Sequence, residues 1–350
     1  MKINKCRACG SKNLVKCLDL GNQYLTGIFP KNKNQKVSIG NLSLVFCNKC
    51  ALLQLSENFN RFEMYGSNYG YMSSLNQSMV NHLKNKARKL KKLANFSKSD
   101  LFIDIGSNDG TFLSFFLNTC QTVGVDPTIK KFKKYYNKKT ITVPDFFSSE
   151  IIKKNLIKKR AKAITSIAMF YDLENPISFA KEIHETLDKE GIWHFEQSYM
   201  PSMIKNISYD TICHEHLEYY SLKSLKYILD QSDFKIIDIE LNDINGGSFA
   251  ITAAKKKSKK FQESGLVEWL LKKEDLYKFN KIETLVDFKN KVFKHKKLLK
   301  DLILNLKDMK KNVAGYGAST KGNVILQFCN LNSKSIPYIV DVNPYKRNRV

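Results

Sequence analysis

The sequence lacks any run of about 20 apolar residues, the length that a helix needs to cross a bilayer. Its first six residues, MKINKC, also lack the apolar core of a secretory signal peptide. We therefore expect a cytoplasmic protein without a membrane partner. Hydrophobic residues still make up 43% of the chain, and 22 residues are Phe, so the 350 residues can form two or three domains with proper cores.

Arginine is scarce in a chain that is otherwise strongly basic. Only six of the 58 basic residues are Arg, although the formal net charge is +25. Proteins that read nucleic-acid sequence rely on the forked guanidinium group to contact base edges. The lysines here are spread from one end of the chain to the other, which indicates a lysine-rich bias on solvated faces. Nucleic acid is therefore not the expected partner, whereas an anionic substrate such as a nucleotide is compatible with this charge.

Four of the eight cysteines form two Cys-x-x-Cys pairs. The pairs are Cys6 with Cys9 and Cys47 with Cys50. Two such pairs can complete a tetrahedron of thiolates around Zn²⁺, with no position left open for catalysis. A redox pair or a disulfide is the alternative, which a cytoplasmic location disfavours. We predict a structural zinc module over residues 1–62, with these four cysteines as its ligands.

A glycine-rich turn follows the first strong strand pattern. Residues 101–105 are apolar enough for a buried strand, and the segment 106–110 has the form Gly-x-x-x-Gly. A second strand, at 122–125, ends at Asp126. Glycines let a ligand approach the backbone closely, and an acid at the end of the second strand can accept both hydroxyls of a ribose. The alternative is an ordinary tight turn without a ligand.

The residues of this turn favour S-adenosylmethionine over a dinucleotide. The turn does not have the Gly-x-Gly-x-x-Gly form that suits a pyrophosphate. It carries two acids, Asp104 and Asp109, which suit a cationic ligand without phosphate. S-adenosylmethionine, with its sulfonium and ammonium groups, fits that description. We therefore predict a methyltransferase.

Strand and helix patterns alternate on both sides of the turn. Strands are expected at 163–167 and 192–196, and helices at 79–95 and 176–188. This alternation predicts a mostly parallel sheet, in a class I methyltransferase α/β domain with a doubly wound sheet over residues 63–205. We expect cofactor contacts from the residues that follow the strands and from the preceding aromatic loop: Asp104, Gly106, Ser107, Asn108, Gly110, Asp126, Pro127, Asp145, Phe146, Ala168 and Tyr71.

Two of these expectations concern the groups around the cofactor. Asp145 could accept from the amino group of adenine, with Phe146 against the ring. The aromatic loop, with Tyr65, Tyr69 and Tyr71, could fold over the cofactor as a lid or serve as a packed linker.

The last part of the sequence predicts a different unit. Residues 258–311 have the pattern of two long, lysine-rich helices. A strand at 313–317, a helix at 320–328 and a second strand at 336–341 then form the start of a βαβ unit, with Lys321 placed to meet a phosphate. We predict a C-terminal, substrate-binding, Rossmann-like domain over 206–350 that is incomplete, and expect the chain to be truncated there.

Several segments carry a resemblance to a known family. Besides the two cysteine pairs, they are Asp104–Gly110, Ser166–Leu173, His194–Met200, Tyr209–Ser221 and Gly315–Asn323. Together they resemble the S-adenosylmethionine-dependent C-methyltransferases that act on nucleotide-linked keto-deoxysugars. The resemblance covers essentially the whole chain and implies a zinc domain, a methyltransferase domain and a C-terminal Rossmann-like domain, with the sugar nucleotide between the last two.

The resemblance implies a reaction that suits the local residues. A carbon nucleophile arises from a keto sugar once the proton next to its carbonyl is removed, and a neutral His can remove it near pH 7. By resemblance, His216 is the catalytic base and Glu215 belongs to the same site. Some relatives carry Tyr where this chain has Cys213, so an acid role would pass to Tyr219 or His214. Substrate contacts are expected from Glu196, Tyr199, Asn245, Gly247 and Lys321.

Other interpretations remain open at this stage. The segment with Asn245 and Gly247 could equally be a hairpin turn. The enzyme could methylate oxygen or nitrogen of another small molecule, or be a catalytically impaired, truncated homologue. A zinc-bearing RNA methyltransferase is a further alternative, which predicts strong, salt-dependent RNA binding.

Overall fold

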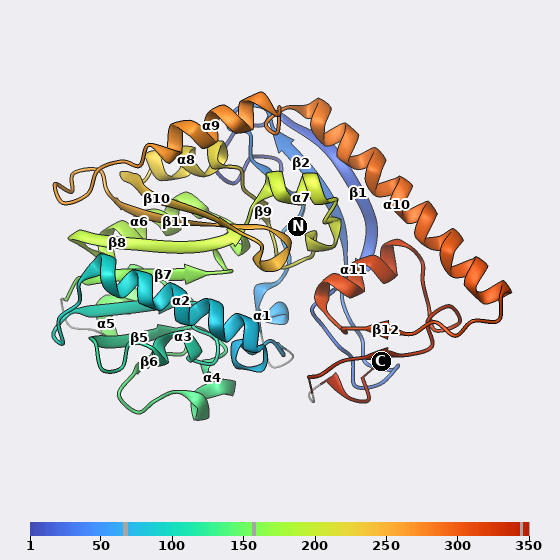
Figure 1. Ribbon diagram of the computed structural model, residues 1–350, viewed down its shortest axis with the longest axis horizontal. Helices are drawn as coiled ribbons and strands as arrows, with labels where there is room; N and C mark the ends of the chain where they lie inside the picture. Colours follow the sequence, from blue (N-terminus) through green and yellow to red (C-terminus); the bar gives the residue numbers. More distant parts are fainter. Residues whose placement is uncertain (66–68, 156–158, 344–345, 350) are drawn as a thin grey trace.

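The computed structural model describes residues 1–65, 69–155, 159–343 and 346–349, and its centre is a seven-stranded sheet (Figure 1). The strands of this sheet are β4 (Leu101–Ile105), β5 (Gln121–Val125), β6 (Ile141–Val143), β7 (Ala161–Ile167), β8 (Leu187–Ser198), β10 (Phe234–Asn242) and β11 (Ser248–Lys255). They lie in the order β10-β11-β8-β7-β4-β5-β6. The strands from β8 to β6 are parallel, whereas β11 is antiparallel to both β8 and β10.

Helices cover both faces of this sheet, because successive side chains of each strand point to opposite faces. On one face, α2 (Gln77–Ala94) packs Leu83, Ala87 and Leu90, which recur at helical spacing, against Phe102 of β4. The short helix α3 (Thr111–Ser114) joins the same cluster. The other face is covered by α5 (Ser149–Asn155), α6 (Pro176–Thr186), α8 (Leu222–Asp230) and α9 (Leu266–Leu276).

The central sheet continues beyond residue 205, where we placed the end of the methyltransferase domain. Its last two strands, β10 and β11, come from the segment that we assigned to the C-terminal domain. Their antiparallel hairpin lies beside β8, so the fold of the sheet is completed only at Lys255. The short helices α1 (Arg61–Met64), α4 (Ile129–Phe132) and α7 (Met200–Asn206) connect these parts.

A second sheet joins the N-terminal module to the middle of the chain. It contains β1 (Leu14–Tyr24), β2 (Ile39–Cys47), β3 (Leu53–Leu55) and β9 (Glu218–Tyr219), in that order. Strand β9 directly follows the His-Glu-His segment, and it pairs with β3 of the cysteine module. The N-terminal module therefore shares a sheet with the segment in which we expect the catalytic base.

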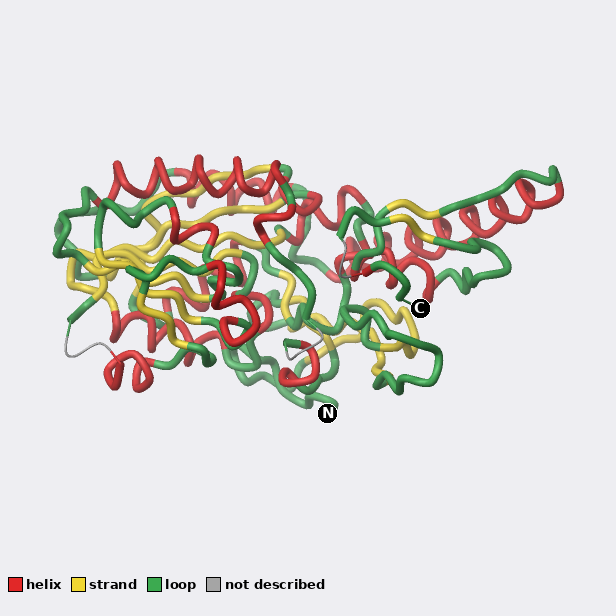
Figure 2. Tube along the Cα trace, turned by 90° about the horizontal axis from the view of Figure 1, so that it is seen from below, coloured by secondary structure: helices red, strands yellow, loops and turns green. Residues whose placement is uncertain are grey.

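The C-terminal unit lies against this second sheet. The long helix α10 (Ile282–Asp308) runs along β1, and its far end extends away from the rest of the chain (Figures 1 and 2). Strands β12 (Gly315–Tyr316) and β13 (Ile339–Val340) pair with each other in parallel, on either side of α11 (Thr320–Phe328). The predicted βαβ unit is thus present as a separate two-stranded sheet.

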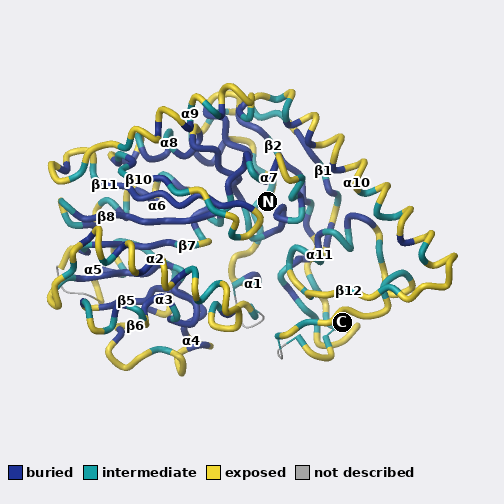
Figure 3. The backbone as a smooth tube through the Cα atoms, in the orientation of Figure 1, coloured by how far each residue is buried: buried dark blue, intermediate teal, exposed yellow. Residues whose placement is uncertain are grey.

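Burial follows this arrangement. The strands of the central sheet are buried along most of their length, whereas α10 exposes one side to solvent (Figure 3). Among the residues that the structure describes, no helix is both long and apolar enough to cross a membrane.

Candidate active site

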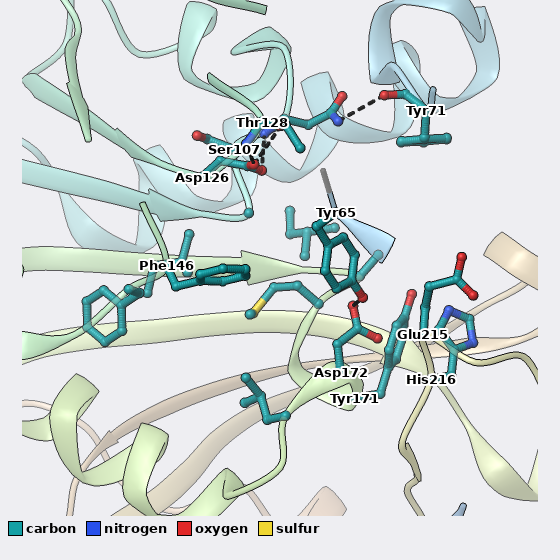
Figure 4. A pocket seen from close by; sticks show the side chains of 18 of the residues that line it. Tyr65, Tyr71, Ser107, Asp126, Thr128, Phe146, Tyr171, Asp172, Glu215 and His216 are labelled. Carbon is teal, nitrogen blue, oxygen red and sulfur yellow. Dashed lines mark hydrogen bonds between the residues drawn. The ribbon is translucent and has the colours of Figure 1, made fainter. Parts of the chain in front are cut away.

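A cavity of about 760 Å³ opens at the carboxyl ends of β4, β5, β6, β7 and β8, the edge at which doubly wound sheets bind ligands. Ser107 and Asp126 lie on one side of it, and Glu215 and His216 lie on the other (Figure 4). The predicted site residues that line it are Tyr71, Asp104, Gly106, Ser107, Asn108, Asp126, Pro127, Asp145, Phe146, Ala168, Glu196, Glu215, His216, Asn245 and Lys321.

Five predicted site residues lie outside the lining of this cavity. Two are glycines with positive φ, 77° at Gly110 and 117° at Gly247, and they shape the turns before α3 and β11. Two are tyrosines with internal partners: the Tyr199 hydroxyl donates to Glu274 Oε1 at 2.8 Å, and the Tyr219 hydroxyl donates to the carbonyl of Thr211 at 3.5 Å. The fifth is His214. These five residues lie in the structure around the cavity and do not line it, so their expected contacts with a ligand stay predictions.

The glycine-rich turn holds Asp126 in place at the end of β5. Gly106 has φ of 72°, and a Cβ there would lie 3.1 Å from Met169 Cγ. The backbone N–H of Asn108 donates to Asp126 Oδ2 at 2.9 Å, and that of Thr128 donates to Oδ1 at 2.7 Å. Oδ1 also accepts from the Thr128 hydroxyl at 2.5 Å. A carboxylate has about four lone-pair sites, so Oδ2 keeps one of them for a ribose hydroxyl.

The two acids of the turn have different positions. Burial raises the pKa of Asp104 to about 7, against a hydrogen bond from Thr165 Oγ1 at 2.6 Å. A cation bound in the cavity would favour the ionised form of this carboxyl. Asp109 instead accepts from the backbone N–H of Thr111 at 3.1 Å and of Ser74 at 2.9 Å. Only Asp104 faces the cavity, which corrects our argument that both acids serve a cationic ligand.

The aromatic loop forms one wall of the cavity. Asn108 fixes it, because its Nδ2 donates to the carbonyl of Tyr71 at 3.1 Å and its Oδ1 accepts from Ser73 N at 3.0 Å. Tyr65 and Tyr69 also line the cavity. Residues 66–68 of this loop lie outside the described residues. The observed contacts agree with a packed wall, and motion as a lid stays a prediction.

The four cysteines of the N-terminal module meet at one point. Their sulfur atoms all lie within 4.8 Å of one another, with Cys6 and Cys50 at 3.5 Å and Cys9 and Cys47 at 3.5 Å. The edge of a zinc–thiolate tetrahedron is ~3.8 Å, from Zn–S bonds of about 2.3 Å. Gln54 Nε2 donates to Cys6 Sγ at 3.3 Å, as an outer-shell partner would. The sulfurs therefore fit a four-cysteine zinc site.

The His-Glu-His segment places its two histidines in different surroundings. His214 is buried against the N-terminal module, with Nδ1 3.2 Å from Thr26 Oγ1 and Nε2 3.3 Å from the carbonyl of Gly40. His216 lines the cavity, and its ring centroid lies 4.1 Å from that of Tyr171. The two rings do not face together, because each side of the segment packs against a different part of the chain.

The tautomer of His216 is set by its surroundings. Nδ1 lies 2.9 Å from the carbonyl of Thr211, which can only accept, so Nδ1 carries the hydrogen and Nε2 is left as an acceptor. Burial lowers the pKa of His216 to about 4, opposed by this bond and assisted by the charge of Lys321. The ring is therefore neutral near pH 7.

Glu215 borders the same cavity and depends on a glycine of the N-terminal module. A Cβ on Gly27 would lie 1.9 Å from Glu215 Oε1. Burial raises the pKa of Glu215 above its usual value. Only a glycine at position 27 leaves room for this carboxyl beside His216.

Glu196 lines the cavity but is already paired. His82 Nε2 lies 2.6 Å from Oε1, while Lys86 Nζ and Asn242 Nδ2 each lie 2.8 Å from Oε2. Burial would raise the pKa of Glu196, but His82 and Lys86 lower it to about 2. His82 is thus a partly buried partner of this carboxylate. The cluster ties α2 to the edge of the sheet.

The C-terminal unit reaches the mouth of the cavity through Lys321. Its Nζ donates to the carbonyl of Asn245 at 2.7 Å. Asn245 belongs to the turn between β10 and β11, so the segment is a hairpin turn and also lines the cavity. Two segments that we predicted to meet a substrate therefore meet each other there.

The doubly wound sheet, with an antiparallel hairpin beside β8 and an acid at the end of β5, defines a class I S-adenosylmethionine-dependent methyltransferase. Family models agree with the three parts of the chain. A zinc binding domain matches residues 6–65, a methyltransferase domain matches 79–239 and a C-methyltransferase C-terminal domain matches 243–350. The chain belongs to the C-methyltransferases that combine these three domains.

Individual relatives are distant. The chain is 24% identical to the C-methyltransferase NovU of Streptomyces niveus over 352 residues, which covers 99% of this chain and 83% of NovU. Among solved structures, it is similar to the plantazolicin methyltransferase BpumL in complex with SAH, at 14% identity and a TM-score of 0.40, over 51% of this chain and 86% of that one. An S-adenosylmethionine-dependent methyltransferase from Clostridium acetobutylicum gives 9% identity and a TM-score of 0.40, over 50% of this chain and 92% of that one.

Replacing Asp126 with asparagine is expected to weaken the binding of S-adenosylmethionine and S-adenosylhomocysteine by about 10- to 100-fold, because hydrogen bonds to a charged acceptor contribute about 1.5–3 kcal/mol. Titration calorimetry measures both affinities. Asp238→Asn, which removes an exposed acid from β10, is the matched control. If a folded Asp126→Asn protein binds both compounds with unchanged affinity, Asp126 does not bind the ribose.

Proposed function

We propose that this C-methyltransferase acts on a nucleotide-linked keto-deoxysugar and attaches the methyl group to a carbon next to the ketone. The observation that carries the proposal is the position of His216. Its Nε2 is available as an acceptor in the same cavity as the glycine-rich turn, on the opposite side from Asp126. A base facing a cofactor site across one cavity suits proton removal followed by transfer to carbon.

The roles of the residues follow from this placement. When bound, S-adenosylmethionine supplies an electrophilic methyl group. Asp126 and the backbone around Gly106 hold the nucleoside end, and Asp104 faces the cationic end. His216 takes the proton from the carbon next to the ketone at Nε2, while its Nδ1 stays bonded to Thr211. The neutral ring can accept this proton without first losing one of its own.

The diphosphate of the substrate is assigned to the mouth of the cavity. Lys321, at the start of α11, brings a positive charge there, and Asn245 provides an adjacent amide. The start of a helix also offers unpaired backbone N–H groups to an anion. We place the enzyme in the cytoplasm, because the reducing conditions there keep cysteine thiols free to bind zinc.

Product analysis tests this proposal. The protein is incubated with S-adenosylmethionine carrying a ¹³C-labelled methyl group and with a panel of keto-deoxysugar nucleotides. We expect one of them to gain a single methyl group whose ¹³C shift is that of a carbon-bound methyl. A shift in the range of an O- or N-methyl group would show transfer to a heteroatom. Binding of S-adenosylmethionine without turnover of any panel member would indicate an impaired homologue.

A further inference from the structure

A hydrogen-bonded pair of acidic groups, Tyr65 and Asp172, lies in the cavity beside the proposed base. The Tyr65 hydroxyl is 2.7 Å from Asp172 Oδ2, and both side chains line the cavity (Figure 4). Asp172 ends the short 3₁₀ turn Phe170–Asp172, which follows β7. The ring of the intervening Tyr171 packs against that of His216 at a tilt of 53°, so the pair and the base are held by the same turn.

The proposed reaction needs a hydrogen-bond donor to the ketone oxygen of the substrate, and no residue has yet been assigned this role. Removal of a proton next to a ketone puts negative charge on the ketone oxygen, and a hydrogen-bond donor aimed at that oxygen stabilises the enolate. Position 213, which lines the cavity, holds Cys213, and a thiol is only a weak donor. Tyr219 and His214, our sequence-based candidates for this role, both face away from the cavity.

Resting on the proposed function, we propose that Tyr65, backed by Asp172, donates the hydrogen bond that stabilises the enolate oxygen of the substrate. In the structure the phenol donates to Asp172 Oδ2; in the proposed reacting state Asp172 is a neutral acid that donates to the phenol oxygen, and the phenol O–H points at the ketone. Tyr65 is then the catalytic residue, because it touches the reacting oxygen, and Asp172 is a positioning residue.

The electrostatics of the pair agree with this arrangement. Burial, helped by the charge of Glu215 and opposed by the bond to Tyr65, raises the pKa of Asp172 well above its usual range. Burial and the nearby charges of Asp172 and Glu215 also raise the pKa of Tyr65. Both shifts favour the protonated forms of the two groups. Asp172 Oδ1 is buried without a hydrogen-bond partner among the described residues, which is costly for a carboxylate and less so for a neutral acid.

The atoms balance over the whole reaction. The C–H bond next to the ketone breaks, and its proton goes to His216 Nε2. The electron pair moves to the ketone oxygen, which accepts the hydrogen bond from Tyr65 without taking the proton. When the new carbon–carbon bond forms, the carbonyl is restored, the S–CH₃ bond breaks and S-adenosylhomocysteine leaves. Tyr65 and Asp172 end the cycle as they began, and His216 releases its proton to solvent.

Deuterium exchange at the carbon next to the ketone isolates this step from methyl transfer. The protein is incubated in deuterated water with TDP-4-keto-6-deoxyglucose and S-adenosylhomocysteine, and label in the sugar is followed by mass spectrometry. We expect Tyr65→Phe to slow exchange by about 100- to 1,000-fold, the loss typical of one oxyanion donor. Affinity for S-adenosylhomocysteine should stay within about twofold, since Tyr65 is assigned to the ketone and not to the cofactor.

Two variants of Asp172 separate a neutral acid from an ionised one. Asparagine can donate to the phenol oxygen and leave the phenol O–H free for the ketone, so Asp172→Asn should keep exchange within about tenfold of the unmodified protein. Leucine can do neither, so Asp172→Leu should lose as much as Tyr65→Phe. Equal losses in Asp172→Asn and Asp172→Leu would overturn the neutral-acid arrangement.

Controls make the remaining outcomes decisive. Tyr277→Phe removes a phenol that is 60% exposed and outside the cavity, and it should exchange at the normal rate. Normal exchange in Tyr65→Phe would overturn this inference and leave the proposed function standing. Absence of exchange in the unmodified protein, over the whole panel of keto sugars, would overturn both. A thermal melt detects loss of folding in Asp172→Leu. In that case the exchange rates of Tyr65→Phe and Asp172→Asn are compared, and an equal loss in both would overturn the neutral-acid arrangement.

Discussion

Replacing His216 with asparagine is expected to slow both deuterium exchange and methyl transfer by about a thousandfold, while binding of S-adenosylmethionine stays within about twofold. A positioned general base contributes about 10²- to 10⁴-fold to proton transfer. Asparagine suits this test because its Nδ2 can replace the ring Nδ1 and keep the bond to the Thr211 carbonyl, now at 2.9 Å. The variant therefore removes the basic nitrogen and leaves the local backbone supported.

His295→Asn is the matched control for this variant. His295 is exposed on α10 and bonds to Tyr209, so its loss should leave exchange unchanged. The pH profile gives an independent reading. Because burial lowers the pKa of His216 to about 4, the base stays neutral as the pH falls, and the acid limb of the exchange rate should lie below the ordinary histidine value of about 6.5. A His216→Asn protein that exchanges normally would contradict the assignment of the base.

Regular elements could be predicted from the sequence because their signals are local. The helix expected at 320–328 is α11 (Thr320–Phe328), and the one expected at 79–95 is α2 (Gln77–Ala94). The glycine-rich turn was found because the positive φ at Gly106 requires a residue type that is visible in the sequence. The two cysteine pairs were found for the same reason, since the spacing of their thiolates is set by a tight turn.

The orientation of the His-Glu-His segment could not be predicted in the same way. His214 is turned inward by Thr26 and Gly40, which lie 188 and 174 residues away in the chain. Its neighbour His216 is turned to the cavity by Thr211 and Tyr171. Nothing in the order of three consecutive polar residues indicates which of them meets which partner.

Pairs formed across the fold were missed for a related reason. Glu196 was expected to meet a substrate, but His82 and Lys86 from α2 already hold its carboxylate. Asp172 lay within a segment that supported the family resemblance, yet only its bond to Tyr65 draws attention to it. One signal was available: Asp172 follows a buried strand at the edge where parallel sheets place ligands, as Asp126 does.

Removing zinc is expected to abolish methyl transfer while leaving much of the binding of S-adenosylmethionine in place. Zinc contributes about 10–16 kcal/mol to the folding of small thiolate modules, so Cys47→Ser should unfold the N-terminal module. That module supplies β3, whose Leu53 and Gln54 pair with Tyr219 and Glu218 of β9, two residues beyond His216. It also supplies Thr26 and Gly27, which pack against His214 and Glu215.

The central sheet does not depend on the module in the same way. The module adds Ala8 and Leu52 to the core cluster of Ile103 and Trp193. The aromatic cluster at Phe102 contains no residue of the module, and the bonds that hold Asp126 come from Asn108 and Thr128. Zinc loss should therefore separate the two sides of the cavity, with the cofactor side intact and the base side disordered.

Metal content, calorimetry with S-adenosylmethionine and the exchange assay are compared for Cys47→Ser and for Cys17→Ser. Cys17 is a buried cysteine of the same module, and its thiol donates to the Val15 carbonyl outside the cluster, so the control should keep zinc and activity. Normal exchange by a zinc-free Cys47→Ser protein would show that β9 and His214 hold the base without the module. Equal loss of cofactor binding and exchange would show that the module supports the whole fold and not one side of its active site.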